Sequence, residues 1–343
     1  MEYGAIDLHL RRSVVRILNE NEEIVLDRRI ETSRADFDRL FAGRASMRIL
    51  IESSTESAWV AQHLEELGHE VIVADPNYAA MYGSRSRKVK TDKRDVAALA
   101  IACRRGNYRR AHRVSAASRQ LRQQMRLRRH LVQTRSGLIS LLRSVLRQEG
   151  RRLPTGSAEG VVARLDRLSL PAAVTATLAP LRAVIAQLTA TLTGIDTAVD
   201  ACAANDPVAQ QLMTAPGVGP VLALTFHAVM DDPARFGGDA GRASAFVGLV
   251  PSEATSDERQ RKGHITKSGP GDLRALLVQA SWVIWRGRRA AGAALRRWAQ
   301  ALAARRGRRI AIVALARRLT RMLYAMWRDR RDFVARPADA IAA

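Results

Sequence analysis

The sequence contains few cysteines, few acidic residues relative to basic ones, and no long apolar run. Its two cysteines, Cys103 and Cys202, are too few and too far apart for a disulfide framework or a zinc site. No uninterrupted apolar stretch reaches the length that spans a bilayer, and the charges of residues 1–12 are placed unlike those of a signal peptide. These absences exclude a disulfide-stapled secreted module, and they predict a soluble cytoplasmic protein with no membrane partner.

The shortage of acids leaves a strongly basic chain. The 56 Lys and Arg residues outnumber the 33 Asp and Glu residues, which gives a net charge of +23 and a pI near 11.4. Such an excess favours a polyanionic partner, nucleic acid before all, with an anionic membrane surface as the other option. At 343 residues and 47% apolar composition, the chain can form two or three domains with cores of their own.

The first hundred residues alternate between short β-branched runs and short amphipathic helices. Three such runs come first, and the turn signal NEN before the third predicts an antiparallel meander. Ser33 is placed to cap the first helix. The predicted elements are strands over 3–9, 13–18 and 23–30, a helix over 32–43, a strand over 47–53, a helix over 56–68, a strand over 69–75 and a helix from Asp92. Three strands followed by alternating helix and strand is the order of an RNase H-like mixed sheet.

Two long helices are predicted in the middle of the chain. Residues 96–148 contain no acid and many arginines, with a partial leucine stripe, so the simplest interpretation is one long basic helix. A second apolar-striped helix over 171–203, which Pro180 would kink or divide, suggests an antiparallel coiled-coil hairpin or pairing between protomers. The predicted division is an α/β domain over 1–110, basic coiled-coil helices over 111–205, a mostly helical domain over 206–332 and a disordered tail over 333–343.

Two aspartates, Asp92 and Asp95, lie three residues apart among Lys90, Lys93 and Arg94 in KTDKRDVAALA. If a helix begins at Asp92, Asp95 lies one turn later on nearly the same face, so both carboxylates can converge on one point. The ordinary alternative is that Asp92 caps the helix, Asp95 complements its dipole, and the basic neighbours are their ion-pair partners.

Two further acids favour a shared site. Asp7 lies among apolar residues of the first strand, where a carboxylate is costly unless a cation or donor meets it, and Glu52 ends the fourth strand. In an RNase H-like sheet these two strands are adjacent, and a following helix can cover their rim. The sequence therefore predicts one cluster of Asp7, Glu52, Asp92 and Asp95. Such a cluster suits Mg²⁺ or Mn²⁺, and two metals about 4 Å apart can clamp a phosphodiester.

These motifs resemble the IS110 family of transposases. AIDLH, IESS and KTDKRDVAALA are similar to the four-acid RuvC-like domain of that family, and APGVGPVLAL, the segment over 243–269 and LRALLVQASW are similar to its C-terminal transposase domain. The resemblance covers nearly the whole chain in order. It implies a DNA transposase or recombinase in which the four acids bind metal and act with a nucleophilic serine that becomes joined to DNA.

The serine that best matches the nucleophile is Ser256. This chain has Thr255-Ser256-Asp257 where the family commonly has Ser-Ser-Gly, so Ser252 and Thr255 stay open as substitutes. A hydroxyl needs a base or metal to remove its proton and cations to stabilise the phosphorane. Several basic residues that could stabilise this charge follow Ser256 in the sequence. From residue type alone, an ordinary turn serine is the simpler interpretation.

Other positions are candidates for contact with nucleic acid. PGVGP resembles the hairpin of helix-hairpin-helix modules, whose glycines expose backbone amides to phosphate, although any tight turn can need such glycines. His227, Trp282 and Trp285 are interpreted as core or helix-face residues. The predicted contacts are Lys90, Lys93, Arg94, Arg122, Arg126, Arg129, Gly217, Gly219, Arg259, Arg261 and Lys267.

The resemblance also implies partners that the residues do not show by themselves. These are target and donor DNA, a structured noncoding bridge RNA that pairs with both, a homodimer or homotetramer, and association with the nucleoid. Two other functions stay open: a metal-dependent nuclease or junction resolvase that uses water as nucleophile, and a non-catalytic nucleic-acid-binding protein whose acids are caps and ion pairs.

Overall fold

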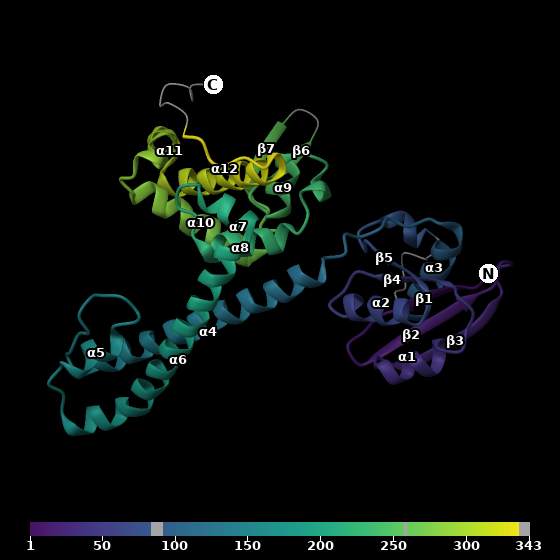
Figure 1. Ribbon diagram of the computed structural model, residues 1–343, viewed down its shortest axis with the longest axis horizontal. Helices are drawn as coiled ribbons and strands as arrows, with labels where there is room; N and C mark the ends of the chain where they lie inside the picture. Colours follow the sequence, from purple (N-terminus) through teal and green to yellow (C-terminus); the bar gives the residue numbers. More distant parts are fainter. Residues whose placement is uncertain (84–91, 257–258, 336–343) are drawn as a thin grey trace. The chain divides into compact units, whose positions relative to one another are not determined.

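The computed structural model describes residues 1–83, 92–256 and 259–335, with residues 92–93, 254–256 and 259–262 described by their backbone alone. The chain divides into two compact units, residues 1–113 and 114–343. Figure 1 shows that the first unit is built on a sheet and the second mainly on helices. The predicted fold class, an α/β domain with a RuvC-like mixed sheet followed by a helical region, is confirmed.

The sheet of the first unit is mixed. Its strand order is β3-β2-β1-β4-β5, with β1, β2 and β3 antiparallel and β4 and β5 parallel to β1. The antiparallel meander and the adjacency of the first and fourth strands are therefore both confirmed. The strands are β1 (Tyr3–Asp7), β2 (Arg12–Leu18), β3 (Ile24–Glu31), β4 (Arg48–Glu52) and β5 (Glu70–Ala74).

Helices cover both faces of the sheet, because successive strand residues point to opposite sides. On one face, Ile6, Ile49 and Ile51 pack in a core with Phe37 of α1 (Arg34–Phe41) and Leu64 of α2 (Ser57–Glu66). Ser33 caps α1 as predicted, since its side chain accepts a hydrogen bond from the Asp36 amide.

The opposite face of the sheet is covered by α3 (Asp92–Arg105), after a short 3₁₀ turn, η1 (Ala79–Tyr82). Val96, Leu99 and Cys103 of α3 are buried against Ala5 and Leu50 of the strands. The apolar residues of α3 that follow Asp95 therefore fix the helix onto the centre of the sheet.

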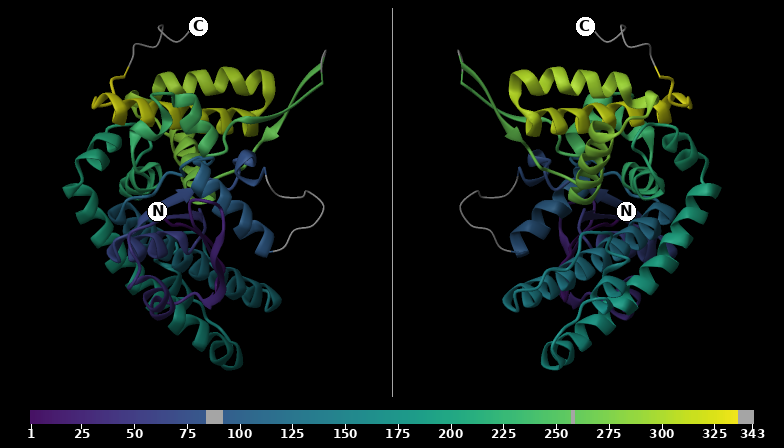
Figure 2. Two further views of the ribbon diagram at one scale, coloured as in Figure 1. Left: turned by 90° about the vertical axis from the view of Figure 1, so that its right-hand side faces the viewer. Right: turned by 90° about the vertical axis from the view of Figure 1, so that its left-hand side faces the viewer.

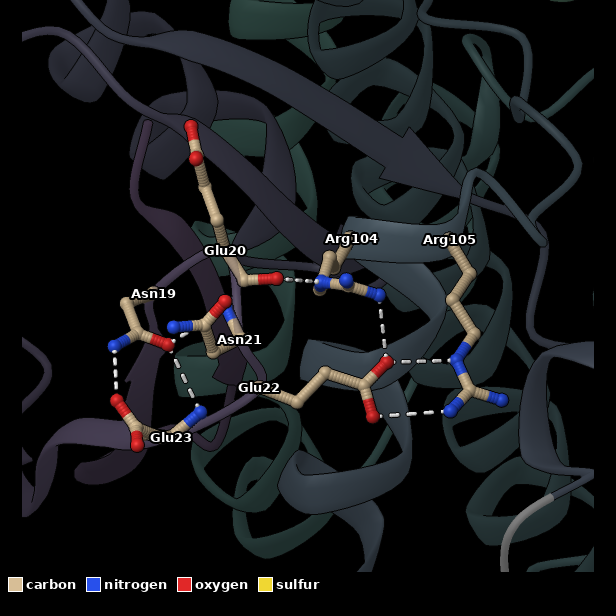
Figure 3. Close-up of polar contacts among 7 residues, drawn as sticks. All are labelled: Asn19, Glu20, Asn21, Glu22, Glu23, Arg104 and Arg105. Atoms are coloured by element: carbon tan, nitrogen blue, oxygen red, sulfur yellow. Dashed lines mark hydrogen bonds and ion pairs between the residues drawn. The ribbon is translucent and has the colours of Figure 1, made fainter.

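The turn between β2 and β3 holds the C-terminal end of α3 (Figure 3). Glu22, which has φ +65, accepts hydrogen bonds from Arg104 Nη1 at 2.8 Å and from Arg105 Nε and Nη2 at 2.8 and 3.0 Å. The pKa of Glu22 is lowered, first by the hydrogen bond from Arg105. The Asn19 side-chain oxygen shapes the turn by accepting from the amides of Asn21 and Glu23. These contacts hold the C-terminal end of α3 at the end of the sheet where β1 begins.

The prediction of a single basic helix over 96–148 is wrong, because the chain leaves helical geometry between Arg105 and Ala116. Gly106 has φ +69, a conformation that favours glycine over other residues. The next segment then pairs with the end of β5: the Asp75 amide donates to Arg109 O at 2.8 Å and the Ala111 amide to Val73 O at 2.8 Å. Pairing with the sheet edge satisfies backbone groups that a continuous helix would have satisfied internally.

The second unit contains an antiparallel helical hairpin of α4 (Ala116–Gln148) and α6 (Ala172–Asn205). Leu142 packs in a core with Leu178, whereas Met125 packs in a core with Val199, so the two helices run in opposite directions. The predicted hairpin is confirmed within one chain. Pro180 does not divide α6, which continues through it.

Basic residues enter the seam of this hairpin. Positions facing α6 recur along α4 at the alternating spacings of three and four that are typical of coiled coils. Arg128 and Arg135 occupy two of these positions, and each is paired: Arg128 Nε lies 2.5 Å from Asp196 Oδ1, and Arg135 Nη2 lies 2.9 Å from Glu159 Oε1. A short helix, α5 (Val161–Asp166), packs at the far end of the hairpin.

The length and apolar composition of α6 would allow it to span a bilayer, and it is the one helix of that kind in the described part of the chain. Length and composition alone are weak evidence for a membrane span, and α6 contacts α4 along its length. Arg182 and Asp196 interrupt this helix, so it does not contradict the prediction that no uninterrupted apolar stretch spans a bilayer.

The rest of the second unit packs around α12, whose Leu315, Leu319 and Tyr324 are fully buried. A two-stranded hairpin, β6–β7, projects from these helices (Figure 2). The elements are α7 (Pro207–Met213), α8 (Pro220–Met230), η2 (Pro233–Phe236), α9 (Ala240–Phe246), β6 (Pro251–Ser256), β7 (Arg259–Ile265), α10 (Gly271–Arg286), η3 (Ala290–Gly292), α11 (Ala293–Arg306) and α12 (Arg308–Asp329).

The burial of Cys103 gives a direct test of how α3 packs. Its Sγ donates to Arg48 O at 3.5 Å, and burial raises its pKa to about 12, whereas Cys202 is exposed. At pH 8 a thiol reagent should modify one cysteine quickly and the second only when the protein unfolds, because the thiolate is the reactive form. Cys202→Ser should remove the fast phase. Two equally fast thiols would contradict the packing of α3.

Candidate active site

Two of the predicted acids lie at the carboxyl ends of neighbouring parallel strands. Ile6 of β1 pairs with Ile51 of β4, and Asp7 and Glu52 are the next residues along each strand. The Asp7 side chain is 13% exposed and its Oδ2 lies 3.4 Å from His9 Nε2. Glu52 Oε1 accepts a hydrogen bond from the Tyr82 hydroxyl. The parallel pairing of β1 and β4 therefore brings both carboxylates to one rim of the sheet.

The other two acids lie at the beginning of α3. The C-terminal end of α3 is held where β1 and β4 begin, by Glu22 and by the Cys103 contact with Arg48 O. Because α3 runs along both strands, its first turn points toward their carboxyl ends. Asp95 is 7% exposed at this end of the helix. Asp92 is the first residue of α3, and its side chain lies outside the described residues.

The donor set offered here consists of carboxylate oxygens, which are the ligands that Mg²⁺ and Mn²⁺ prefer. Among residues whose side chains are described, no three His, Cys, Asp or Glu side chains come together as a metal-binding group. Asp92 is not one of those residues, so the four-acid cluster stays a prediction. The ends of β1 and β4 and the beginning of α3 lie at the same rim of the sheet, where this cluster is predicted.

The predicted nucleophile lies on the β6–β7 hairpin, which sequence reasoning did not anticipate. Ser256 is the last residue of β6 and pairs in register with Arg259, while Ala254 pairs with Arg261. Residues two apart in a strand occupy the same face, so positions 256, 259 and 261 share one face of the hairpin and position 255 belongs to the other. The side chains of all these residues lie outside the described set.

Ser252, an alternative nucleophile, has a described side chain. It lies at the base of the hairpin, four residues before Ser256, and its hydroxyl donates to His264 O at 3.0 Å. A Cβ placed on Gly263 would lie 2.5 Å from this hydroxyl oxygen. Ser252 is therefore engaged in holding the two strands together.

Two glycines and an arginine hold the root of the hairpin. A Cβ on Gly248 would lie 2.2 Å from Ser268 O, and one on Gly269 would lie 1.9 Å from Phe246 O. Both residues have positive φ, +71 and +72. Arg274 Nη1 donates to Val247 O at 2.8 Å and to Ser268 O at 3.0 Å, one carbonyl on each side of the root. The close approach of the two segments therefore depends on the absence of side chains at both glycines.

The PGVG segment joins two helices, α7 and α8, as a helix-hairpin-helix module requires. Gly217 has φ +76 and lies against α10, since a Cβ there would be 2.8 Å from Ala280 O. Gly219 precedes α8 and has no atom within 4 Å of its Cβ position. No side chain caps the first turn of α8. Gly217 thus has a packing role, whereas the position of Gly219 has room for a side chain.

The basic residues predicted to bind nucleic acid differ in their contacts and in their exposure to solvent. Arg122 donates to Ala228 O at 2.9 Å and to Val229 O at 2.7 Å, which ties α4 to the end of α8, and burial lowers its pKa. Arg129 Nη1 lies 2.7 Å from Asp272 Oδ1. Arg94, Arg126 and Lys267 are exposed. Lys90 and the side chains of Lys93, Arg259 and Arg261 lie outside the described residues.

Structural roles that sequence reasoning missed belong to Arg274, to Asp206 and to the polar hairpin itself. Asp206 caps α7 and lies 2.7 Å from His227 Nδ1, which agrees with the prediction that His227 is a packed residue on the helix. The residues of the hairpin, PSEATS and RQRKGHI, are almost all polar and give no alternating apolar pattern that could have revealed it.

In comparisons with known proteins, two transposase family models match different parts of the chain. Residues 5–150 match the DEDD_Tnp_IS110 model, described as a transposase, and residues 209–296 match the model described as Transposase IS116/IS110/IS902 family. A probable family 20 transposase of Pseudomonas aeruginosa is 28% identical over 336 residues, which cover 95% of this chain and 97% of that protein.

Two relatives from insertion sequences are similar over shorter regions. The transposase for IS1328 of Yersinia enterocolitica is 24% identical over 303 residues, 86% of this chain and 87% of its own length. The transposase for IS1111A of Coxiella burnetii is 28% identical over 246 residues, 69% of this chain and 66% of its own length.

The hairpin root predicts opposite effects for two glycine substitutions. Gly269→Ala should destabilise the protein by roughly 1–3 kcal/mol or more, because it adds a strained φ to a clash with Phe246 O. Gly137→Ala, within α4 where no atom lies within 4 Å, should stabilise by about 0.5–1 kcal/mol. Urea unfolding followed by circular dichroism measures both. Equal effects would show that the root does not depend on its glycines.

Proposed function

Because the chain belongs to the IS110 family of transposases, we propose that it cuts and rejoins DNA with a metal-binding acidic cluster and a serine nucleophile. The observation that carries the proposal is the convergence of Asp7, Glu52 and the first turn of α3 at one rim of the sheet. A family of transposases acts on DNA, and a basic chain with a hard-oxygen site suits chemistry on phosphodiesters.

Asp7, Glu52, Asp92 and Asp95 would hold Mg²⁺ or Mn²⁺ in this proposal. The bound metal would supply Lewis-acid stabilisation of the phosphate and lower the pKa of an attacking hydroxyl. Asp95 is buried and the Asp7 side chain is 13% exposed, so both carboxylates are largely withdrawn from bulk water at the end of the sheet where a cation would bind.

Ser256 would attack the DNA phosphorus through its hydroxyl oxygen. Its proton leaves to a base, the bond from phosphorus to the leaving nucleotide oxygen breaks, and a phosphoserine ester conserves the phosphodiester energy. A hydroxyl of the second DNA strand then attacks the ester and releases the serine. Arg259 and Arg261, at positions on the same face of the hairpin as Ser256, would stabilise the negative charge of each phosphorane.

The position of Ser256 supports it over the two alternatives. Ser252 donates its hydroxyl proton to His264 O at the hairpin base, and Thr255 pairs with Gln260 on the other face. These two observations favour Ser256 as the nucleophile in this proposal.

The acids and the serine belong to different compact units, residues 1–113 and 114–343. In this proposal both units contribute residues to catalysis, and the protein acts as a homodimer or homotetramer. The acid-free α4 offers arginines to a polyanion, and the proposal includes a structured bridge RNA bound there alongside target and donor DNA.

Substitution of the serine tests the covalent step. Wild-type protein incubated with a suicide DNA substrate should give a protein–DNA adduct on a denaturing gel, and Ser256→Ala should give none, because no hydroxyl is left to form the ester. Ser252→Ala is the matched control and should keep the adduct. If Ser256→Ala still cuts DNA without an adduct, the nucleophile is water and the protein is a nuclease.

Removal of the metal ligands tests the acidic cluster. Asp7→Asn should reduce recombination at least a hundredfold, since the amide keeps the shape of the side chain but removes the charge that binds the cation. Chelation with EDTA should have the same effect, and added Mg²⁺ should reverse it for wild type only. Full activity of Asp7→Asn would support a non-catalytic role for the acids.

A further inference from the structure

A pocket of about 500 Å³ lies within the second unit, between α4, α8 and α10. Neither the four acids nor Ser256 are among the residues that line it. Val132 of α4, Val221 and Val229 of α8, and Leu276 of α10 supply apolar walls, and Phe246 of α9 also lines the pocket. The volume is within the range of sites that hold small organic groups.

The polar lining of this pocket is dominated by arginine. Arg122, Arg126, Arg128 and Arg129 all line it, whereas Asp272 is the single acid among the lining residues. Asp272 pairs with Arg129 at 2.7 Å, Arg128 pairs with Asp196, and Arg122 donates to main-chain carbonyls. A negatively charged ligand is therefore favoured at the rim.

Arg126 differs from the other three arginines. It is exposed at the rim, and among the described residues no carboxylate or carbonyl pairs with it. Two amide side chains, Gln133 and Gln279, also line the pocket and can donate or accept. Thr225, by contrast, donates its hydroxyl to Val221 O at 2.6 Å.

We propose that this pocket receives an unpaired nucleotide of the DNA on which the protein acts. An unstacked base presents flat apolar faces with polar edges, which fit the Phe246 and valine walls and the two glutamines. Its phosphate would lie on Arg126. An acidic peptide would satisfy the arginine but leaves the apolar depth of the pocket unfilled.

The pocket adjoins the root of the β6–β7 hairpin. Phe246 comes two residues before Gly248, and Pro270 directly follows Gly269, so both glycines of the root border segments that line the pocket. A base in the pocket would contact the two segments whose approach holds the hairpin. The inference rests on the proposed action on DNA, but not on Ser256 as the nucleophile.

Fluorescence anisotropy with labelled duplexes tests the pocket in the full-length protein. Three probes differ at one position: a fully paired duplex, a duplex with one bulged thymidine, and the same bulge with an abasic site. Wild type should bind the bulged thymidine about tenfold more tightly than the other two, as expected for stacking of one base. Equal affinity for the three probes would overturn the proposal.

Variants distinguish binding in the pocket from the general electrostatic attraction of arginines to DNA. Ala275→Phe and Val132→Phe fill it from opposite walls, and each should abolish the preference while keeping the affinity for paired duplex. Arg126→Gln should weaken the preference, and Arg143→Gln, an exposed arginine of the same helix that does not line the pocket, should preserve it.

Two outcomes would reject the proposal outright. One is retention of the preference by both filled variants when thermal unfolding shows them folded, and the other is competition by a poly-glutamate peptide at the same concentration as a free oligonucleotide. Failure of the proposed function is a different result, since it would appear as absence of DNA recombination by a protein that still prefers the bulge.

Discussion

The orientation of α3 across the sheet is the constraint on which the candidate active site depends. Its apolar face is buried on β1 and β4, and its C-terminal end is held by Glu22 through two arginines. The hydrophobic contacts fix the helix on the sheet, and the ion pairs hold its C-terminal end near the beginning of β1. Reversal of the helix would place its first turn at the opposite end of the strands, away from Asp7 and Glu52. The placement of the first turn of α3 near the acids thus depends on packing along the whole helix.

In the second unit, arginine performs two physically different tasks. Arg122 and Arg274 are structural, because their donors are committed to main-chain carbonyls at the end of α8 and at the hairpin root. Arg128 and Arg135 lie in the coiled-coil seam and are neutralised by carboxylates. Only the remainder, of which Arg126 is an example, is available to phosphate. The net charge of the chain thus overstates the surface that nucleic acid can use.

Much of the first unit was predictable, because its strands and helices are local patterns. The meander, the Ser33 cap and the strands that end at Asp7 and Glu52 follow from alternation and capping, which depend on neighbouring residues. The break between α3 and α4 was not predictable from composition. Arginine is compatible with a helix, and the segment leaves helical geometry because the edge of β5 offers its backbone other partners. The β6–β7 hairpin was missed for a related reason, since its residues are polar and form no apolar stripe.

By itself, the sequence determined the family, the mixed sheet, the helical hairpin and the residue types of the site, because motif spacing and side-chain periodicity are properties of the linear chain. Tertiary structure alone decided which arginines are free, why Gly248 and Gly269 must lack side chains, and that a pocket forms beside the hairpin root. These features arise where segments distant in sequence approach within a few ångströms. At that range a single Cβ or an unpaired donor determines the packing, and no local pattern in the chain encodes it.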